Sequence, residues 1–310
     1  MHIKILKKKV QQILTVLTDW RWWPFYIQRR FIQPKIRAYL SSLLAATRPL
    51  AAPVQSFVEE WDQHNLALKH FGISQLGSLL SQKQCTELKS YFSNLMVFDP
   101  YHPKKPHYLP KSVARNPQSH IAHHHALDIV TAPYLLKLAN DPRILDVAAA
   151  FLGCKPTLGY LAVWWSYHTE EGAQHAEQFH RDVDDWRFLK LFIYLTDVNE
   201  NSGPHIYVAQ SSISEKLREI RRFDDAEVVS VFGQSNVLQL TGKAGKAFLE
   251  DTFGIHKGQP VQEGSRLIFQ AVYSMFPLPY GPKYPVINQS ELSSDSIFLD
   301  PWVNRLYVSS

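Results

Sequence analysis

The sequence of 310 residues is poor in cysteine and lacks several common catalytic motifs. Cys85 and Cys154 are its two cysteines, so a disulfide framework is excluded. They form no C-x-x-C motif, and we expect both to be buried structural residues in a reducing compartment. The P-loop, G-x-G-x-x-G and G-x-S-x-G motifs are absent, which gives no support to a mononucleotide site, a dinucleotide fold or a serine hydrolase.

Long hydrophobic runs are also missing. No stretch of about 18 apolar residues occurs, so we expect no segment to cross a bilayer as a helix. The basic start, residues 1–9, resembles the beginning of a signal peptide, but Gln11, Gln12 and Thr15 interrupt the apolar stretch that should follow. We therefore expect a cytoplasmic protein that is not secreted.

Acidic residues are scarce near the N-terminus. The first 50 residues hold ten Lys or Arg and one acid, Asp19, a net charge of +9, whereas the remaining residues carry −4. Apolar residues at helical spacing alternate there with basic ones on the opposite face; they are Ile3, Leu6, Val10, Ile13 and Leu17. An aromatic cluster with two arginines follows: Trp20, Trp22, Trp23, Phe25, Tyr26, Arg29 and Arg30.

This composition divides the chain into a basic helical arm, residues 1–52, and a mildly acidic domain, residues 53–310. Lysines opposite an apolar stripe, beside tryptophans, are typical of a helix that lies reversibly in a membrane surface. The alternative is a helix packed on the domain or on a second subunit. Nucleic acid is not expected as a partner, because the domain is acidic and the arm is too apolar for a phosphate clamp.

Helices are expected before strands in the domain. The patterns predict helices over 54–68, 81–94 and 132–152, an extended piece over 71–76, and an irregular proline-rich loop over 99–117. Strands are predicted over 158–167, 188–195, 205–209, 228–231 and 266–274. The absence of alternating βα units favours an α+β fold, with a helical cover on an antiparallel barrel or jelly roll at about 154–276, and an extended tail over 277–310.

The segment 178–182 (Gln-Phe-His-Arg-Asp) carries the strongest chemical signal. In a strand, side chains two residues apart point to the same face, so His180 and Asp182 would share one site. His256 is a candidate third ligand, and two His with one carboxylate leave open positions on a metal, as in non-haem Fe(II) oxygenases. Arg266 follows ten residues later at the start of an apolar strand, where a buried guanidinium needs an anion.

This pattern resembles the iron- and 2-oxoglutarate-dependent dioxygenases with a double-stranded β-helix core. The surrounding sequence is most similar to the phytanoyl-CoA dioxygenase family within that superfamily. The similarity lies in residues 188–198 (FLKLFIYLTDV), in 201–208 (NSGPHIYV) and in the opening helix near 77–88. It covers about residues 68–276. At 209–212 the sequence reads Ala-Gln-Ser-Ser where family members often have Pro-Gly-Ser-His, so the substrate rim is expected to differ.

The resemblance implies a role for each matched residue. His180, Asp182 and His256 would bind Fe(II), Arg266 would bind the distal carboxylate of 2-oxoglutarate, and Tyr194 would border that cosubstrate. No catalytic residue beyond the metal ligands is implied. With O2, such an enzyme converts 2-oxoglutarate to succinate and CO2 while it hydroxylates a small organic substrate. Halogenating relatives lack the carboxylate ligand, so the presence of Asp182 favours hydroxylation.

Several alternatives stay open at this stage. The histidines at 120, 123, 124 and 125 are either a pocket wall or solvated surface, and Asp184 and Asp185 are either a polar turn or a substrate contact. A membrane-seeking arm would suit a lipid or lipid-linked substrate. Two other functions compete with the oxygenase: a membrane-peripheral binding protein with a non-catalytic barrel, and a cupin-like metalloenzyme that needs no 2-oxoglutarate.

Overall fold

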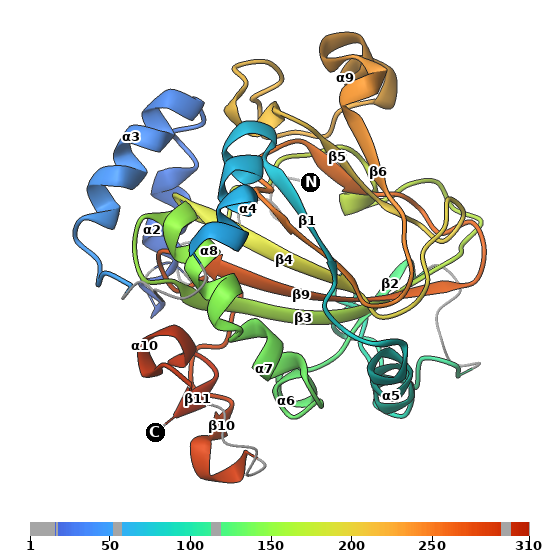
Figure 1. Ribbon diagram of the computed structural model, residues 1–310. Helices are drawn as coiled ribbons and strands as arrows, with labels where there is room; N and C mark the ends of the chain where they lie inside the picture. Colours follow the sequence, from blue (N-terminus) through green and yellow to red (C-terminus); the bar gives the residue numbers. More distant parts are fainter. Residues whose placement is uncertain (1–15, 17, 52–57, 113–118, 293–298, 310) are drawn as a thin grey trace, which may run out of the picture.

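Two antiparallel sheets face one another in the computed structural model, which describes residues 16, 18–51, 58–112, 119–292 and 299–309 (Figure 1). The larger sheet has six strands in the order β1 (Ile73–Ser78), β7 (Lys246–Glu250), β4 (Phe188–Tyr194), β9 (Ser265–Ser274), β3 (Thr157–Tyr167) and β2 (Ile121–His123). The smaller sheet has the order β6 (Val237–Leu240), β5 (His205–Val208) and β8 (His256–Gly258). This is the predicted α+β fold with a double-stranded β-helix core.

Helices pack on the outer face of the larger sheet. They are α4 (Val58–Phe71), α5 (Gln82–Ser93), α6 (Ala126–Val130), α7 (Leu135–Ala139) and α8 (Pro142–Leu152). Strand β4 is buried on both faces, which explains its continuous apolar sequence. Leu189, Leu191 and Ile193 belong to the core shared with the helices, whereas Phe192 and Tyr194 belong to the cluster between the two sheets.

Local sequence signals set the ends of these helices. The Ser81 hydroxyl accepts a hydrogen bond from the Gln84 amide, and the Gln84 side chain accepts one from the Ser81 amide, a capping box that begins α5. At α8, the Asp141 carboxylate accepts from the Arg143 amide, and Gly153 ends the helix with a φ of 76°. The predicted helices over 81–94 and 132–152 are therefore confirmed, although the second is divided into α7 and α8.

Part of the basic arm docks on the domain. It forms α2 (Trp22–Gln28) and α3 (Pro34–Ala45). The Arg21 guanidinium donates to the carbonyls of Leu278 at 3.1 Å and Pro282 at 2.8 Å, and the Gln28 amide donates to Val183 O at 2.7 Å. Residues 21–45 thus pack on the domain, which is the alternative to membrane attachment given above. The predicted amphipathic helix over 3–17 lies almost entirely outside the described residues. Every helix in the described ranges is too short or too polar to cross a lipid bilayer.

Two predictions about secondary structure were wrong. Residues 228–231 lie in a helix, α9 (Asp225–Phe232), because Asp225 and Glu227 favour a helix N-terminus and Gly233 follows its last residue. The tail is not extended throughout, since it contains α10 (Pro301–Asn304) and a parallel pair of short strands, β10 (Ile287–Asn288) and β11 (Val308–Ser309). The expectation that both cysteines are buried is confirmed, and both are free thiols.

One histidine belongs to the hydrophobic core. His124 is buried, its ring lies 4.7 Å from that of Phe92, and neither ring nitrogen has a hydrogen-bond partner in the described part of the chain. Burial lowers the pKa of His124 from 6.5 to about 3, and the neighbouring His123 and His125 act in the same direction. The imidazole is therefore neutral in the folded state at ordinary pH.

His124 should make the fold sensitive to acid. The unfolded chain binds a proton at His124 below about pH 6.5, whereas the folded chain does not until about pH 3, so stability is present above the unfolded value and falls with pH between the two. We expect His124→Leu to recover about 2 kcal/mol of the unfolding free energy lost between about pH 7 and pH 5. Urea denaturation across this range measures the difference.

The matched control is His70→Leu, which changes an exposed histidine on the same domain. Its pH profile should follow that of the wild type. An unchanged acid profile in His124→Leu would contradict the prediction.

Candidate functional site

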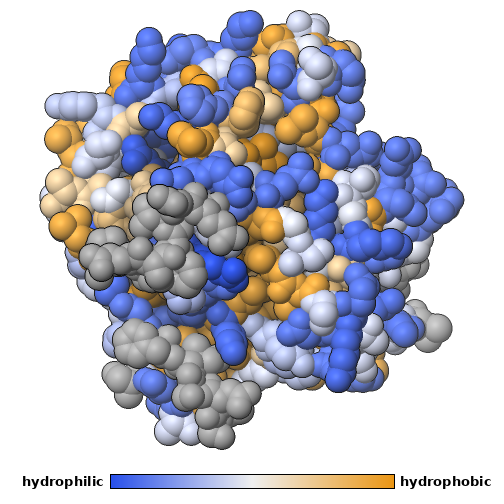
Figure 2. Space-filling view, viewed as in Figure 1, coloured by the Kyte–Doolittle hydropathy of each residue, from blue (hydrophilic) through white to orange (hydrophobic). Residues whose placement is uncertain are grey.

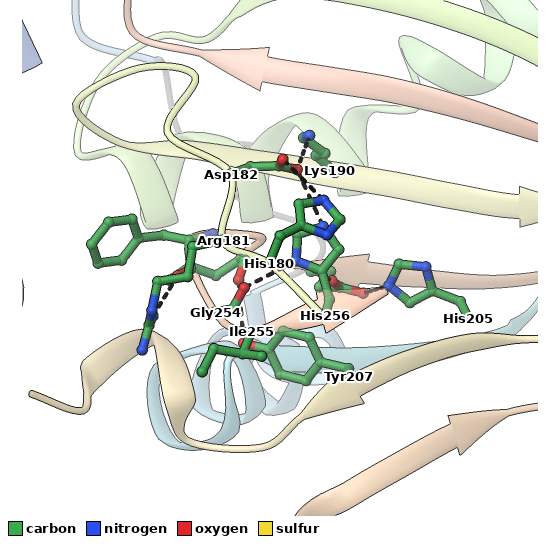
Figure 3. Close-up of polar contacts among 12 residues, drawn as sticks. His180, Arg181, Asp182, Lys190, His205, Tyr207, Gly254, Ile255 and His256 are labelled. Atoms are coloured by element: carbon green, nitrogen blue, oxygen red, sulfur yellow. Dashed lines mark hydrogen bonds and ion pairs between the residues drawn. The ribbon is translucent and has the colours of Figure 1, made fainter. Parts of the chain in front are cut away.

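A single backbone bridge brings the two histidines together. His180 and His256 pair as an isolated antiparallel bridge, and the amide of each donates to the carbonyl of the other at 3.0 Å. His256 begins β8, which pairs with β5 of the smaller sheet. Their rings lie 4.3 Å apart, on the side of the bridge that also holds Asp182 (Figure 3). The predicted convergence of these three side chains therefore occurs, although His180 and Asp182 lie beside the sheet rather than within a strand.

Backbone carbonyls fix the orientation of both imidazoles. His180 Nδ1 lies 2.9 Å from Gln178 O, and His256 Nδ1 lies 3.0 Å from Gly254 O. A carbonyl can only accept, so each Nδ1 carries a proton and each Nε2 is the ring nitrogen that is left to face Asp182. His180 Nε2 lies 3.5 Å from Asp182 Oδ1, and His256 Nε2 lies 3.3 Å from Asp182 Oδ2. A hydrogen bond from the other ring nitrogen, here Nδ1, to a backbone carbonyl is typical of metal-binding histidines.

Asp182 is held ionised by its surroundings. Lys190 on β4 donates to Asp182 Oδ2 at 2.6 Å and also lies 2.9 Å from Asp184 Oδ2. Burial opposes ionisation of Asp182, but Lys190 and then His256 outweigh it, and the pKa of Asp182 lies well below its ordinary value. One ligand atom from each of His180, Asp182 and His256 lies within 4.8 Å of the others. This donor set fits a divalent ion such as Fe(II).

Arg266 lies at the start of β9 and lines the same cavity. One of its terminal nitrogens donates to Gly203 O and the other to the Ser166 hydroxyl at 3.0 Å, while Nε has no hydrogen-bond partner among the described residues. Burial lowers the pKa of this guanidinium. A buried cation with an unused donor fits a carboxylate ligand such as that of 2-oxoglutarate.

Tyr194 is placed differently from this group. Its hydroxyl donates to Leu240 O at 2.7 Å and accepts from the His205 amide at 3.0 Å. It is not one of the residues that line the cavity. Its hydroxyl joins β4 to the smaller sheet, which is a structural contact.

The cavity has a volume of about 260 Å³ and reaches from the three converging ligands to an aromatic wall. That wall includes Tyr101, Tyr160, Trp164, Phe192 and His123, and the His123 ring stacks on Trp164 at 5.6 Å. The histidine cluster is thus divided among environments. His120 and His123 line the cavity, His124 is in the core, and His125 is exposed. His120 Nδ1 also lies 2.7 Å from a Glu177 carboxylate oxygen.

Sequence reasoning missed three charged or titratable residues here: Lys190, His205 and Glu250. His205 lines the cavity and stacks on His256 with ring centroids 5.6 Å apart (Figure 3). Its Nε2 lies 2.8 Å from a carboxylate oxygen of the buried Glu250. Burial lowers the pKa of His205, although Glu250 opposes this effect. The sequence signal that could have identified them is a single polar residue within an apolar strand, as in the Leu-Lys-Leu of β4, because a charged residue is rarely buried without a partner.

The fold that carries this site is similar to that of several solved structures. No protein-family model and no curated protein matches the sequence. Among solved structures, the chain is similar to the non-haem α-ketoglutarate-dependent epimerase SnoN from nogalamycin biosynthesis, with a TM-score of 0.50, 15% identity, and coverage of 69% of this chain and 82% of SnoN. It is also similar to HygX from Streptomyces hygroscopicus with nickel and 2-oxoglutarate bound, with a TM-score of 0.50, 15% identity, and coverage of 78% and 96%. The chain therefore has the fold seen in these two proteins.

Proposed function

We propose that this protein is an Fe(II)- and 2-oxoglutarate-dependent oxygenase that hydroxylates a carbon of a small organic substrate. The observation that carries the proposal is the arrangement in one cavity of two imidazole Nε2 atoms, one carboxylate and a buried guanidinium. The fold shared with SnoN, an α-ketoglutarate-dependent epimerase, and with HygX, solved with 2-oxoglutarate bound, supports it. The resemblance of residues 188–198 and 201–208 to segments of phytanoyl-CoA dioxygenases favours the same class.

His180, Asp182 and His256 would hold the iron, and Arg266 would hold the distal carboxylate of 2-oxoglutarate. When bound, iron and 2-oxoglutarate would supply the oxidising chemistry, in which O2 and 2-oxoglutarate give succinate, CO2 and an oxidised substrate carbon. The protein contributes the rest. Carbonyl contacts at Nδ1 turn both Nε2 atoms toward Asp182, and Lys190 keeps Asp182 ionised.

The walls of the cavity indicate what the substrate presents to the metal. Tyr160, Trp164 and Phe192 offer apolar surface, while Gln174 and Gln270 offer amide groups. With a volume of about 260 Å³, the cavity has room for 2-oxoglutarate and a limited part of a second molecule. We propose that an apolar portion of a substrate, lipid or lipid-linked, enters while the remainder stays outside.

Anaerobic titration distinguishes this function from its rivals. With Fe(II) and 2-oxoglutarate added to the full-length protein, we expect stoichiometric iron and a weak visible charge-transfer band from the chelate. Iron binding without the band would favour a cupin-like metalloenzyme that needs no 2-oxoglutarate. No iron binding would favour a non-catalytic barrel.

The carboxylate ligand can be tested against its close neighbour. Asp182→Ala should abolish the charge-transfer band and succinate formation, because two imidazoles alone hold Fe(II) weakly. Asp184→Asn is the control, since it also removes a carboxylate from Lys190 but leaves the three ligands in place. Metal analysis and the visible spectrum measure both. Equal iron content and an equal band in Asp182→Ala would contradict the assignment.

Arg266 should determine affinity for the cosubstrate rather than for iron. Arg266→Met removes charge-assisted hydrogen bonds worth about 1.5–3 kcal/mol, so the 2-oxoglutarate concentration at half-maximal band intensity should rise roughly 10- to 100-fold. Iron content should be unchanged. Arg266→Lys keeps the positive charge but loses the planar group that donates two hydrogen bonds. Its half-maximal 2-oxoglutarate concentration should lie between those of the wild type and Arg266→Met. If Arg266→Met titrates like the wild type, another group binds the dicarboxylate.

A further inference from the structure

Polar side chains on the two docked helices of the arm are buried against the domain. The buried residues of α3 are Arg37, Ser41 and Ala45, and that of α2 is Gln28. The Arg37 guanidinium donates to Asp185 O and lies 4.6 Å from the ring of Phe253. Docking therefore combines hydrogen bonds to backbone carbonyls of the domain with apolar contacts, since Ala45 belongs to the hydrophobic core and Leu40 and Leu44 pack against it.

Six other apolar side chains of the two helices are exposed to solvent. On α3 they are Ile36, Tyr39 and Leu43, spaced three and four residues apart, and on α2 they are Trp23, Tyr26 and Ile27. Tyr39 is 66% exposed and Trp23 is 51% exposed. Hydrophobic side chains gather along the left edge of the molecule, where α2 and α3 lie (Figures 1 and 2). We name these six side chains the outer face.

Basic residues accompany the outer face without any acid. Between Asp19 and Glu59 the sequence contains no acidic residue. Arg21 and Arg37 are used in docking, whereas Arg30, in the connection between the two helices, and Lys35, in the first turn of α3, are exposed, and Arg29 is partly exposed. The surface thus combines tryptophan, tyrosine and aliphatic side chains with uncompensated positive charge.

We propose that the outer face docks the protein on an anionic lipid surface, with α2 and α3 lying in the interface. Tryptophan and tyrosine are enriched at the headgroup level, where an amphipathic ring meets both water and acyl chains. Basic side chains beside them are attracted to the negative potential of phosphatidylserine-rich leaflets. This inference concerns attachment and does not depend on the proposed oxygenase activity.

A second copy of the chain fits this surface less well. In a two-fold dimer the same patch meets itself, so the basic residues of both protomers would gather in one interface to which residues 20–58 bring no acidic partner. Like charges brought together in this way repel, and charged residues are depleted in the cores of protein interfaces. A negatively charged bilayer removes this repulsion.

Vesicle flotation with the full-length protein tests the proposal. We expect binding to vesicles of equal parts phosphatidylcholine and phosphatidylserine, and little binding to phosphatidylcholine alone. Binding should also fall in about 1 M salt, where the Debye length is about 3 Å. Trp23→Ser combined with Tyr39→Ser, and Arg30→Glu combined with Lys35→Glu, should each lower the partition coefficient at least about 10-fold.

Matched variants control for general changes in polarity and charge. Met96→Ser with Leu127→Ser removes two exposed apolar side chains elsewhere, and Lys83→Glu with Lys89→Glu reverses two exposed charges associated with α5, on the opposite side of the molecule (Figure 1). Both should float like the wild type. Circular dichroism and thermal melting verify that every variant is folded.

Two outcomes would overturn the proposal. One is equal flotation of the wild type and both outer-face variants. The other is no flotation of the wild type together with a concentration-dependent dimer, seen by analytical ultracentrifugation, that the Trp23→Ser and Tyr39→Ser combination dissociates. The charge-transfer titration of the iron site is independent of both results, so failure of membrane docking and failure of the oxygenase function are distinguishable.

Discussion

The candidate site depends on one pair of backbone residues, His180 and His256. Their reciprocal amide–carbonyl hydrogen bonds set the register between the segment before Asp182 and the edge of the smaller sheet. Side chains alternate along an extended chain, so a slip of one residue would turn an imidazole to the opposite side. In this register both rings also find the carbonyl two residues earlier in their own segments. The backbone thereby determines which nitrogens face the cavity.

The same constraint assigns a structural role to the residue between the ligands. Arg181 points away from His180 and Asp182 and donates to the carbonyls of Leu217, Phe253 and Ser211 at 2.6–2.8 Å (Figure 3). Gly254, whose carbonyl orients His256, has no room for a side chain, because a Cβ there would lie 2.3 Å from the Tyr207 hydroxyl. The loops around the cavity are therefore tied to the backbone that carries the ligands.

Spacing within a local segment could be predicted, whereas contacts made across the sheets could not. The His180–Asp182 pair and the offset between His256 and Arg266 follow from the sequence, and so do the strands that contain long apolar runs. The partners of Lys190, His205 and Glu250 depend on which strands become neighbours, and β7 joins β4 only in the folded sheet. For residues 228–231 a local pattern gave the wrong element. Their β-branched residues favour a strand, but acidic residues at the N-terminus of α9 and a glycine after its end favour the helix that forms.

The arm illustrates a further limit of periodicity, because an amphipathic pattern does not say which face meets the domain. In α2 and α3 the residues Gln28 and Arg37 meet the domain together with Leu40, Leu44 and Ala45, and the hydrogen bonds of the two polar side chains end on the loop that follows Asp182. The Gln28 amide donates to Val183 O at 2.7 Å and Arg37 donates to Asp185 O, so these bonds hold two carbonyls within three residues of Asp182. Asp184, which lies between those carbonyls, contacts Lys190, and Lys190 contacts Asp182. The docked arm thus supports the position of Asp182, the candidate carboxylate ligand, through hydrogen bonds to the backbone that follows it.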